Sequence, residues 1–274
     1  MATNSRRILS VGIAGLGAIG GVVAEALAAG IPGLALAAIA VRDRSKADSW
    51  LAPRRIVAEI VSLAALAERC DIVVECLPPA RFAEIAEAVV DAGKILVPLS
   101  VGTLLAHPDL VERARETGAR ILVPTGALIG LDAVRAAAQG RISTVRMVTR
   151  KPPRGLEGAP YLVANNISLA GLTAALKVFE GSAREGAKGF PANVNVAAAL
   201  SLAGIGPDRT RLEIWADPGV ERNMHRIEVD AESARFSMAI ENIPSAENPR
   251  TGRITGLSVV ALLRGLTAPL VVGT

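Results

Sequence analysis

The chain contains two histidines, His107 and His225, so few residues can serve as an imidazole acid or base. His107 precedes Pro108 and Asp109 near the start of a predicted surface helix, and we expect a structural role for it. His225 lies at the entry to a predicted strand, in the segment Asn223-Met224-His225. An unperturbed imidazole has a pKa of about 6.5. His225 is therefore predicted to exchange a proton with a ligand, the alternative being a half-exposed strand histidine.

A glycine-rich run is the second chemical feature of the chain. It follows the apolar stretch 8–14 and opens an alanine-rich helical stretch. In a strand–glycine loop–helix arrangement, the first glycine permits a tight turn, the second lets a pyrophosphate approach the backbone, and the third lets the helix lie close to the strand. Unpaired N–H groups at the helix N-terminus then bind phosphate. We predict a dinucleotide site at Gly15, Leu16, Gly17, Ala18, Ile19 and Gly20.

Charged residues follow the second predicted strand, where a dinucleotide-binding fold contacts the adenosine ribose. Asp43 can accept hydrogen bonds from the ribose hydroxyls and would favour NAD, whereas Arg42 or Arg44 would accommodate the 2′-phosphate of NADP. A solvated charged loop is the remaining alternative. Pro78, after the fourth predicted strand, either shapes the loop on the nicotinamide side or simply ends the strand.

Two amides, Asn193 and Asn195, stand at the start of an otherwise apolar helix predicted over residues 194–203. Asn193 can cap that helix, and Asn195 then lies in its first turn. We expect both side chains to face a ligand at the helix N-terminus, with capping as the alternative for Asn193.

The pattern of elements explains how these residues are brought together. Up to about residue 124, short apolar segments alternate with helical ones, which predicts a doubly wound α/β domain with a parallel sheet. Ligands of such sheets bind at the carboxyl ends of the strands. The predicted strands are 8–14, 34–41, 56–61, 71–77, 94–99 and 120–123, and the helices between them include 81–92 and 105–117.

The second half has a different pattern. Alternating strands at 144–150, 212–216, 227–229 and 235–240 predict an α+β domain with an antiparallel sheet. We place the dinucleotide-binding domain at 1–126 and the catalytic and dimerisation domain at 127–251. A C-terminal helix at about 252–274 is expected to return to the first domain. An exposed face of the second sheet would suit a homodimer.

Composition narrows the class of protein. Hydrophobic residues make up 51% of the 274 residues, so a large core is expected, and the net charge of +4 is scattered rather than clustered with aromatics. We therefore expect no nucleic-acid partner. Cys70 and Cys76 form neither a disulfide framework nor a metal set, which suits a reducing cytoplasm. Arg6 and Arg7 precede an uncharged run like that of an export signal, but its many glycines argue against export or membrane insertion.

Several motifs in the same order resemble those of the L-aspartate dehydrogenase family, which makes iminoaspartate for NAD biosynthesis in some prokaryotes. The resemblance spans nearly the whole chain. It rests on the glycine-rich run, on residues 125–133 beginning Thr125-Gly126-Ala127, on residues 188–196, and on Ala216-Asp217-Pro218 together with Asn223-Met224-His225. The family usually has serine where this chain has Thr125, which keeps the hydroxyl.

The resemblance implies a Rossmann-type first domain and NAD or NADP as cofactor, with no metal. It implies that His225 is the catalytic residue and that Ala127 and one asparagine of the pair contact the nicotinamide, with Asn195 favoured over Asn193. L-aspartate would be oxidised at Cα to iminoaspartate, which water converts to oxaloacetate and ammonia. For the two substrate carboxylates we suggest Lys188, Arg222 and the amides before the helix that begins at Val194.

Two other functions remain open from the sequence. A related two-domain NAD(P)-dependent oxidoreductase would act on another substrate, such as homoserine or a cyclic imine, and such enzymes often use lysine as the acid–base group. A non-catalytic dinucleotide-binding sensor would need the glycine-rich run but neither His225 nor the paired amides.

Overall fold

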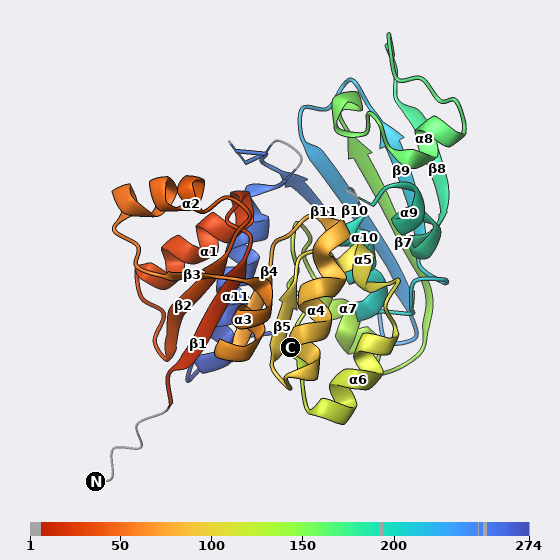
Figure 1. The fold of residues 1–274 in the computed structure, drawn as a ribbon. Helices are drawn as coiled ribbons and strands as arrows, with labels where there is room; N and C mark the ends of the chain where they lie inside the picture. The colour runs from red at the N-terminus through yellow and green to blue at the C-terminus, as the bar shows by residue number, and fades with distance from the viewer. Residues whose placement is uncertain (1–6, 192–193, 246, 249–250, 274) are drawn as a thin grey trace. The chain divides into compact units, whose positions relative to one another are not determined.

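The structure is a computed structural model that describes residues 7–191, 194–245, 247–248 and 251–273 (Figure 1). These residues form two compact units. The first comprises residues 7–100, His107–Pro124 and Gly256–Val271. The second comprises Val101–Ala106, most of Thr125–Thr255, and residues 272–273. No described helix is both long and apolar enough to cross a membrane.

The first unit is built on a parallel sheet of six strands in the order β3-β2-β1-β4-β5-β6. Strand order reverses between β1 and β4, which creates the switch point where doubly wound sheets bind ligands. The strands are β1 (Leu9–Ala14), β2 (Leu34–Ala40), β3 (Glu59–Val61), β4 (Ile72–Glu75), β5 (Ile95–Pro98) and β6 (Arg120–Ile121). All six lie within the predicted ranges.

Helices cover both faces of this sheet. Val11 and Ile13 of β1 belong to the buried cluster that contains Val23 of α1 and Val259 of α11. Gly12 points to the other face, where an added Cβ would lie 2.8 Å from Leu66 Cδ1 of α3. The helices of this unit are α1 (Ala18–Ala28), α2 (Arg44–Leu51), α3 (Leu63–Arg69), α4 (Phe82–Asp91), α6 (Asp109–Thr117) and most of α11 (Arg253–Thr267).

One predicted helix is shorter in the structure. The range 105–117 contains only α6, and a separate short helix, α5 (Val101–Leu104), precedes it. Pro108 stands at the N-cap of α6, because proline disfavours helical conformation in the residue before it and so begins a new helix. The centroid of the His107 ring lies 5.7 Å from that of the Phe82 ring. This packing gives His107 a structural role.

The second unit is built on a five-stranded sheet in the order β11-β10-β7-β9-β8. The strands are β7 (Ile142–Lys151), β8 (Leu176–Ser182), β9 (Arg211–Ala216), β10 (Asn223–Ala231) and β11 (Arg235–Asn242). The predicted class, an α/β domain with a second sheet domain, is confirmed. One detail was wrong: the second sheet is mixed, because the long connection through β8 and three helices returns the chain along β9 parallel to β7.

The two faces of this second sheet differ in chemistry. On one face, helices cover apolar side chains: an added Cβ on Gly186 of α9 would lie 2.6 Å from Leu212 Cδ2 of β9, and one on Gly204, after α10, would lie 3.6 Å from Val145 Cγ2 of β7. The opposite face carries charged residues. The helices of this unit are α5, α7 (Leu131–Ala137), α8 (Pro160–Ala164), α9 (Ala183–Gly189) and α10 (Asn195–Ala203).

Candidate active site

The glycine-rich run forms a tight turn between β1 and α1. Gly15 has a φ of +101°, which L side chains rarely adopt. A Cβ on Gly20 would lie 2.0 Å from the carbonyl oxygen of Gly15, so only glycine lets α1 pack this closely. A Cβ on Gly17 would meet nothing within 4 Å, and no side chain caps α1 at Gly17. The first N–H groups of α1, which begins with Ala18 and Ile19, therefore have no side-chain acceptor at this cap.

A cavity of about 700 Å³ opens beside this turn. Five residues predicted from the sequence line it: Gly15, Leu16, Arg42, Asp43 and Pro78. They come from the ends of β1, β2 and β4, which the fold brings to one edge of the sheet. The cavity, the left-handed turn and the uncapped helix fit the adenosine and pyrophosphate of a dinucleotide.

The residues predicted to contact the ribose lie among charges of both signs. Asp43 accepts a hydrogen bond from the backbone N–H of Lys46 at 3.0 Å and so caps α2. Arg54 and Arg81, which also line the cavity, are paired with Glu25 and Glu84 respectively. Arg42 and Lys46 line the cavity too and form no ion pair with any described residue. A ribose diol and a 2′-phosphate would therefore both find a partner here.

Glu75, at the end of β4, was not predicted as part of the site. Its fully buried carboxylate accepts hydrogen bonds from the N–H of Leu77 at 2.8 Å, from the N–H of Ser100 at 2.9 Å and from the Ser100 hydroxyl at 3.0 Å. Burial raises its pKa above the usual value, although these bonds favour the charged form. Glu75 thereby ties the carboxyl ends of β4 and β5 and fixes the loop that leads to Pro78.

His225 lies in β10 on the helix-covered face of the second sheet. It is 3% exposed, and its Nδ1 lies 3.1 Å from the hydroxyl oxygen of Thr149, its register partner on β7. Burial, and then the positive charge of Lys151, lower the pKa of His225 from 6.5 to about 3. The expectation based on an unperturbed pKa was therefore wrong, and the ligand-free imidazole is neutral at physiological pH.

Lys151 is a residue that the sequence analysis missed. It follows Thr149 by two positions on β7, so the alternation of the strand puts both side chains on the same face. It is 5% exposed and is the one buried lysine or arginine among the residues that the structure describes. The signal was present in the sequence, since Thr149 and Lys151 continue the apolar positions Val145 and Met147 at a spacing of two.

The structure does not bring the two cations suggested as carboxylate ligands to the buried site. Lys188 is exposed in α9 and lines a cavity of about 920 Å³ with Arg146 and Glu228. Arg146 and Glu228 alternate with Thr149 and His225 along their strands, so they belong to the other face of the sheet. Arg222 is exposed, just before β10. Their roles in binding substrate remain predictions.

Ala127 lies near the end of the strand pair that carries His225. Its carbonyl accepts a hydrogen bond at 3.0 Å from Nδ2 of Asn242, a residue that is 3% exposed. Asn242 ends β11 opposite Asn223, two positions before His225 on β10. The Thr125–Ala127 loop and the His225 strand are thus joined through Asn242, which the sequence analysis did not identify.

The asparagine pair is only partly described. Asn193 lies outside the described residues. Asn195 is the first residue of α10, and its Oδ1 accepts a hydrogen bond from the N–H of Gly102 at 2.9 Å. That contact holds α5 against α10, so Asn195 has a structural use in addition to its predicted contact with the nicotinamide.

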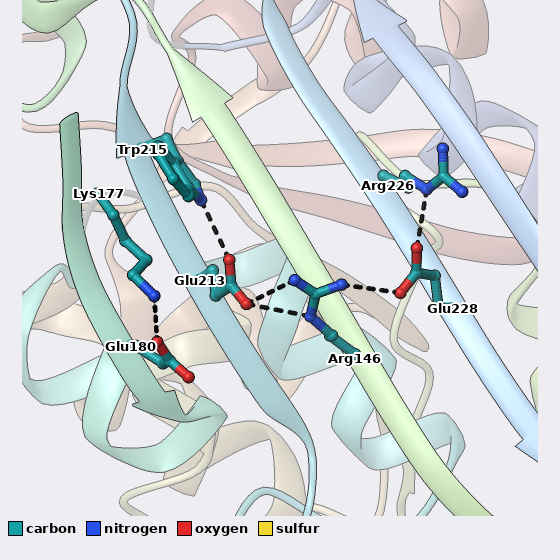
Figure 2. A network of polar contacts seen from close by, with 7 residues as sticks. All are labelled: Arg146, Lys177, Glu180, Glu213, Trp215, Arg226 and Glu228. Carbon is teal, nitrogen blue, oxygen red and sulfur yellow. Dashed lines mark hydrogen bonds and ion pairs between the residues drawn. The ribbon is translucent and has the colours of Figure 1, made fainter. Parts of the chain in front are cut away.

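The outer face of the second sheet carries a polar network. Figure 2 shows Arg146 between Glu213 and Glu228. Its Nη2 lies 2.7 Å from Glu213 Oε1, and its Nη1 lies 2.9 Å from Glu228 Oε2. Trp215 and Arg226 extend the network through Glu213 and Glu228. Lys177 and Glu180 form a separate ion pair on the same face. Among the described residues, no three His, Cys, Asp or Glu side chains gather in a way that would hold a metal ion.

Both halves of the chain are similar to known dehydrogenases. Residues 132–266 match the family described as aspartate dehydrogenase, C-terminal, and residues 15–124 match that described as homoserine dehydrogenase, NAD binding domain. An L-aspartate dehydrogenase of Bradyrhizobium diazoefficiens is 60% identical over 266 residues, which are 97% of this chain and 94% of that protein. L-aspartate dehydrogenase 3 of Bordetella bronchiseptica is 55% identical over 274 residues, which cover 99% of this chain and 100% of that protein.

A similar fold occurs among solved structures. The crystal structure of aspartate dehydrogenase from Thermotoga maritima superposes with a TM-score of 0.74 at 23% identity. The match covers 97% of this chain and 99% of that one. At this identity the likeness bears on the fold alone.

Proposed function

The chain belongs to the L-aspartate dehydrogenase family, and from that premise we propose that it oxidises L-aspartate at Cα with NAD or NADP. The observation that carries the proposal is a neutral, buried imidazole, His225, oriented by Thr149 in a chain that also has a dinucleotide cradle. NAD(P), when bound, accepts the hydride. Gly17 and the first turn of α1 are proposed to hold its pyrophosphate, with Arg42 and Asp43 at the ribose and Ala127 and Asn195 at the nicotinamide.

The proton chemistry is assigned to His225. L-aspartate carries an ammonium group, and its nitrogen must lose a proton before its lone pair can help to expel the hydride from Cα. If Nδ1–H of His225 donates to the Thr149 hydroxyl, Nε2 carries the lone pair that takes this proton. The C–H bond breaks, a C=N bond forms, and iminoaspartate results. Addition of water then yields oxaloacetate and ammonia.

Replacement of His225 tests this assignment. We expect His225→Ala to lower kcat by about 10²–10⁴-fold while the Kd for NADH, measured by fluorescence titration, stays unchanged. His107→Ala is the matched control, since that ring packs on Phe82. Initial rates with L-aspartate and either NAD or NADP provide the readout. Wild-type turnover in His225→Ala would remove this histidine from the mechanism.

A related activity on another amino acid is the second candidate, because residues 15–124 match a homoserine dehydrogenase NAD binding domain. A panel of amino acids that includes L-homoserine separates the two. NAD(P)H formation with L-aspartate alone supports our proposal, and a preference for homoserine overturns it.

Location and assembly are also proposals. Cys70 and Cys76 are free thiols, which suits a cytoplasmic protein. The charged outer face of the second sheet provides a surface for a homodimer. Light scattering of the purified protein would give its mass, and a monomer at micromolar concentration would contradict the dimer. Use of the product in NAD biosynthesis is what the family resemblance implies.

A further inference from the structure

A buried cation stands beside the proposed base. Lys151 and His225 lie on the same face of the second sheet, on the neighbouring strands β7 and β10, and are 5% and 3% exposed. The side chain of Thr149 links the two strands at this position by its contact with His225. Lys151 also forms a backbone contact, since its carbonyl accepts from the N–H of Asp217 at 2.8 Å. The segment of β7 that carries Lys151 is thus fixed by β10 on one side and by the residue after β9 on the other.

A buried ammonium group such as that of Lys151 is unusual for a residue that only stabilises the fold. Removing an ammonium group from water costs several kcal/mol after relaxation, and lysines are therefore almost never fully buried unless they are paired. The exposed cations Lys188 and Arg222 do not share the buried face with His225. A dianionic substrate, in contrast, needs a cation close to the atom where the reaction takes place.

We propose that Lys151 is the cationic subsite that binds a carboxylate of the C4 dicarboxylate substrate next to His225. This inference rests on the proposed dehydrogenase function and adds to it the residue that recognises the acid group. Lys151 then selects dicarboxylic over monocarboxylic amino acids, because a ligand without the second carboxylate lacks one of the anionic groups that the ammonium can bind.

The same contact controls the base. Lys151 is the one charged group among the described residues whose field acts on the imidazole, and it disfavours the imidazolium form. A carboxylate bound to the ammonium cancels that field, so the pKa of His225 rises when the substrate is in place. His225 is then a weak base in the free chain and a stronger one in the complex with a dicarboxylate.

Succinate binding tests the subsite without any turnover. Succinate has two carboxylates and no amino group, so it binds but cannot react. By calorimetry at pH 7.5, Lys151→Met is expected to weaken succinate binding by about 10- to 100-fold, the range of charge-assisted hydrogen bonds, with the Kd for NADH unchanged. Lys177→Met is the matched control, since Lys177 is an exposed lysine on the outer face of the same sheet. Lys151→Arg, which keeps the charge, is expected to restore part of the affinity.

Proton NMR provides a second readout, because the chain has only two histidines. Titration of the His225 ring, assigned with His225→Gln, is expected to move to higher pH when succinate saturates the wild type. In Lys151→Met the ring already titrates higher without ligand, and succinate has little further effect. Thermal unfolding checks that each variant is folded, and Lys151→Gln replaces Lys151→Met if the latter is not.

The outcomes separate this inference from the proposed function. Unchanged succinate affinity in folded Lys151→Met overturns the subsite, as does an equal loss in Lys177→Met, or loss in Lys188→Met alone. If wild-type protein binds succinate through Lys151 but does not oxidise L-aspartate, the dehydrogenase proposal fails while the carboxylate subsite stands.

Discussion

The hydroxyl oxygen of Thr149 lies 3.1 Å from Nδ1 of His225, and the two residues are register partners on β7 and β10. Both are buried, at 3% exposed each. A hydrogen bond to one ring nitrogen determines which tautomer the other nitrogen adopts. In the proposed reaction the Nδ1–H donates to Thr149, and Nε2 is the basic atom.

Thr149→Val removes this hydrogen bond with little change in shape. Because the ring loses its orienting partner, we expect kcat to fall by about tenfold, the equivalent of one hydrogen bond of ~1–1.5 kcal/mol. The Kd for NADH should not change. Steady-state kinetics with L-aspartate would measure this, with Thr144→Val, an exposed position on the same strand, as control. An unchanged kcat would mean that Thr149 does not orient the base.

The lowered pKa of His225 makes stability depend on pH. The folded pKa is about 3 and the unfolded one about 6.5, so between these values the unfolded chain binds a proton that the folded chain does not. The resulting stability is complete above pH 6.5 and is lost as the pH falls towards 3. Between pH 7 and pH 5, the unfolding free energy of the wild type should fall by about 2 kcal/mol more than that of His225→Gln.

Urea unfolding of both proteins at pH 7 and pH 5 measures this difference. Other carboxylates titrate in both proteins, so comparison with His225→Gln isolates the histidine. Equal falls in the two proteins would show that the imidazole is not held neutral by burial.

Two glycines in one turn should respond differently to alanine. At Gly17 an added Cβ meets nothing within 4 Å, whereas at Gly20 it would lie 2.0 Å from the Gly15 carbonyl oxygen. Gly17→Ala should leave thermal stability nearly unchanged and weaken NADH binding by about tenfold or more, because the methyl group occupies the place proposed for the pyrophosphate. Gly20→Ala should lower the free energy of unfolding by about 1–3 kcal/mol through overpacking.

Thermal unfolding without cofactor and fluorescence titration with NADH distinguish the two effects. If Gly17→Ala bound NADH like the wild type, the turn would not be the pyrophosphate site.

Cofactor preference should depend on Arg42 and Asp43. Asp43→Asn can still cap α2, because asparagine caps as well as aspartate, but it loses the charge that favours a ribose diol. We expect the ratio of kcat/KM for NADP to that for NAD to rise in Asp43→Asn and to fall in Arg42→Ala, each by about tenfold. A ratio that is unchanged in both variants would place the ribose elsewhere.

The parallel sheet and the dinucleotide turn were predictable from the sequence. Short apolar segments between helices, and glycines at a spacing that one turn requires, are local features that do not depend on distant contacts. The residues Gly15, Leu16, Arg42, Asp43 and Pro78 line one cavity, since the carboxyl ends of parallel strands meet at one edge. Their contacts with a cofactor stay predictions.

Three features depended on tertiary structure. β9 pairs parallel to β7 because of a connection of some 60 residues, 152–210, whose path no local pattern specifies. Lys151 is read from the sequence as one more cation, and only its burial beside His225 makes it a candidate for binding an anion. The pKa of His225 also depends on the tertiary structure, because desolvation and a neighbouring charge act through space. Residue identity determined which chemical groups the chain carries, and the packing around them determined their charge states and partners.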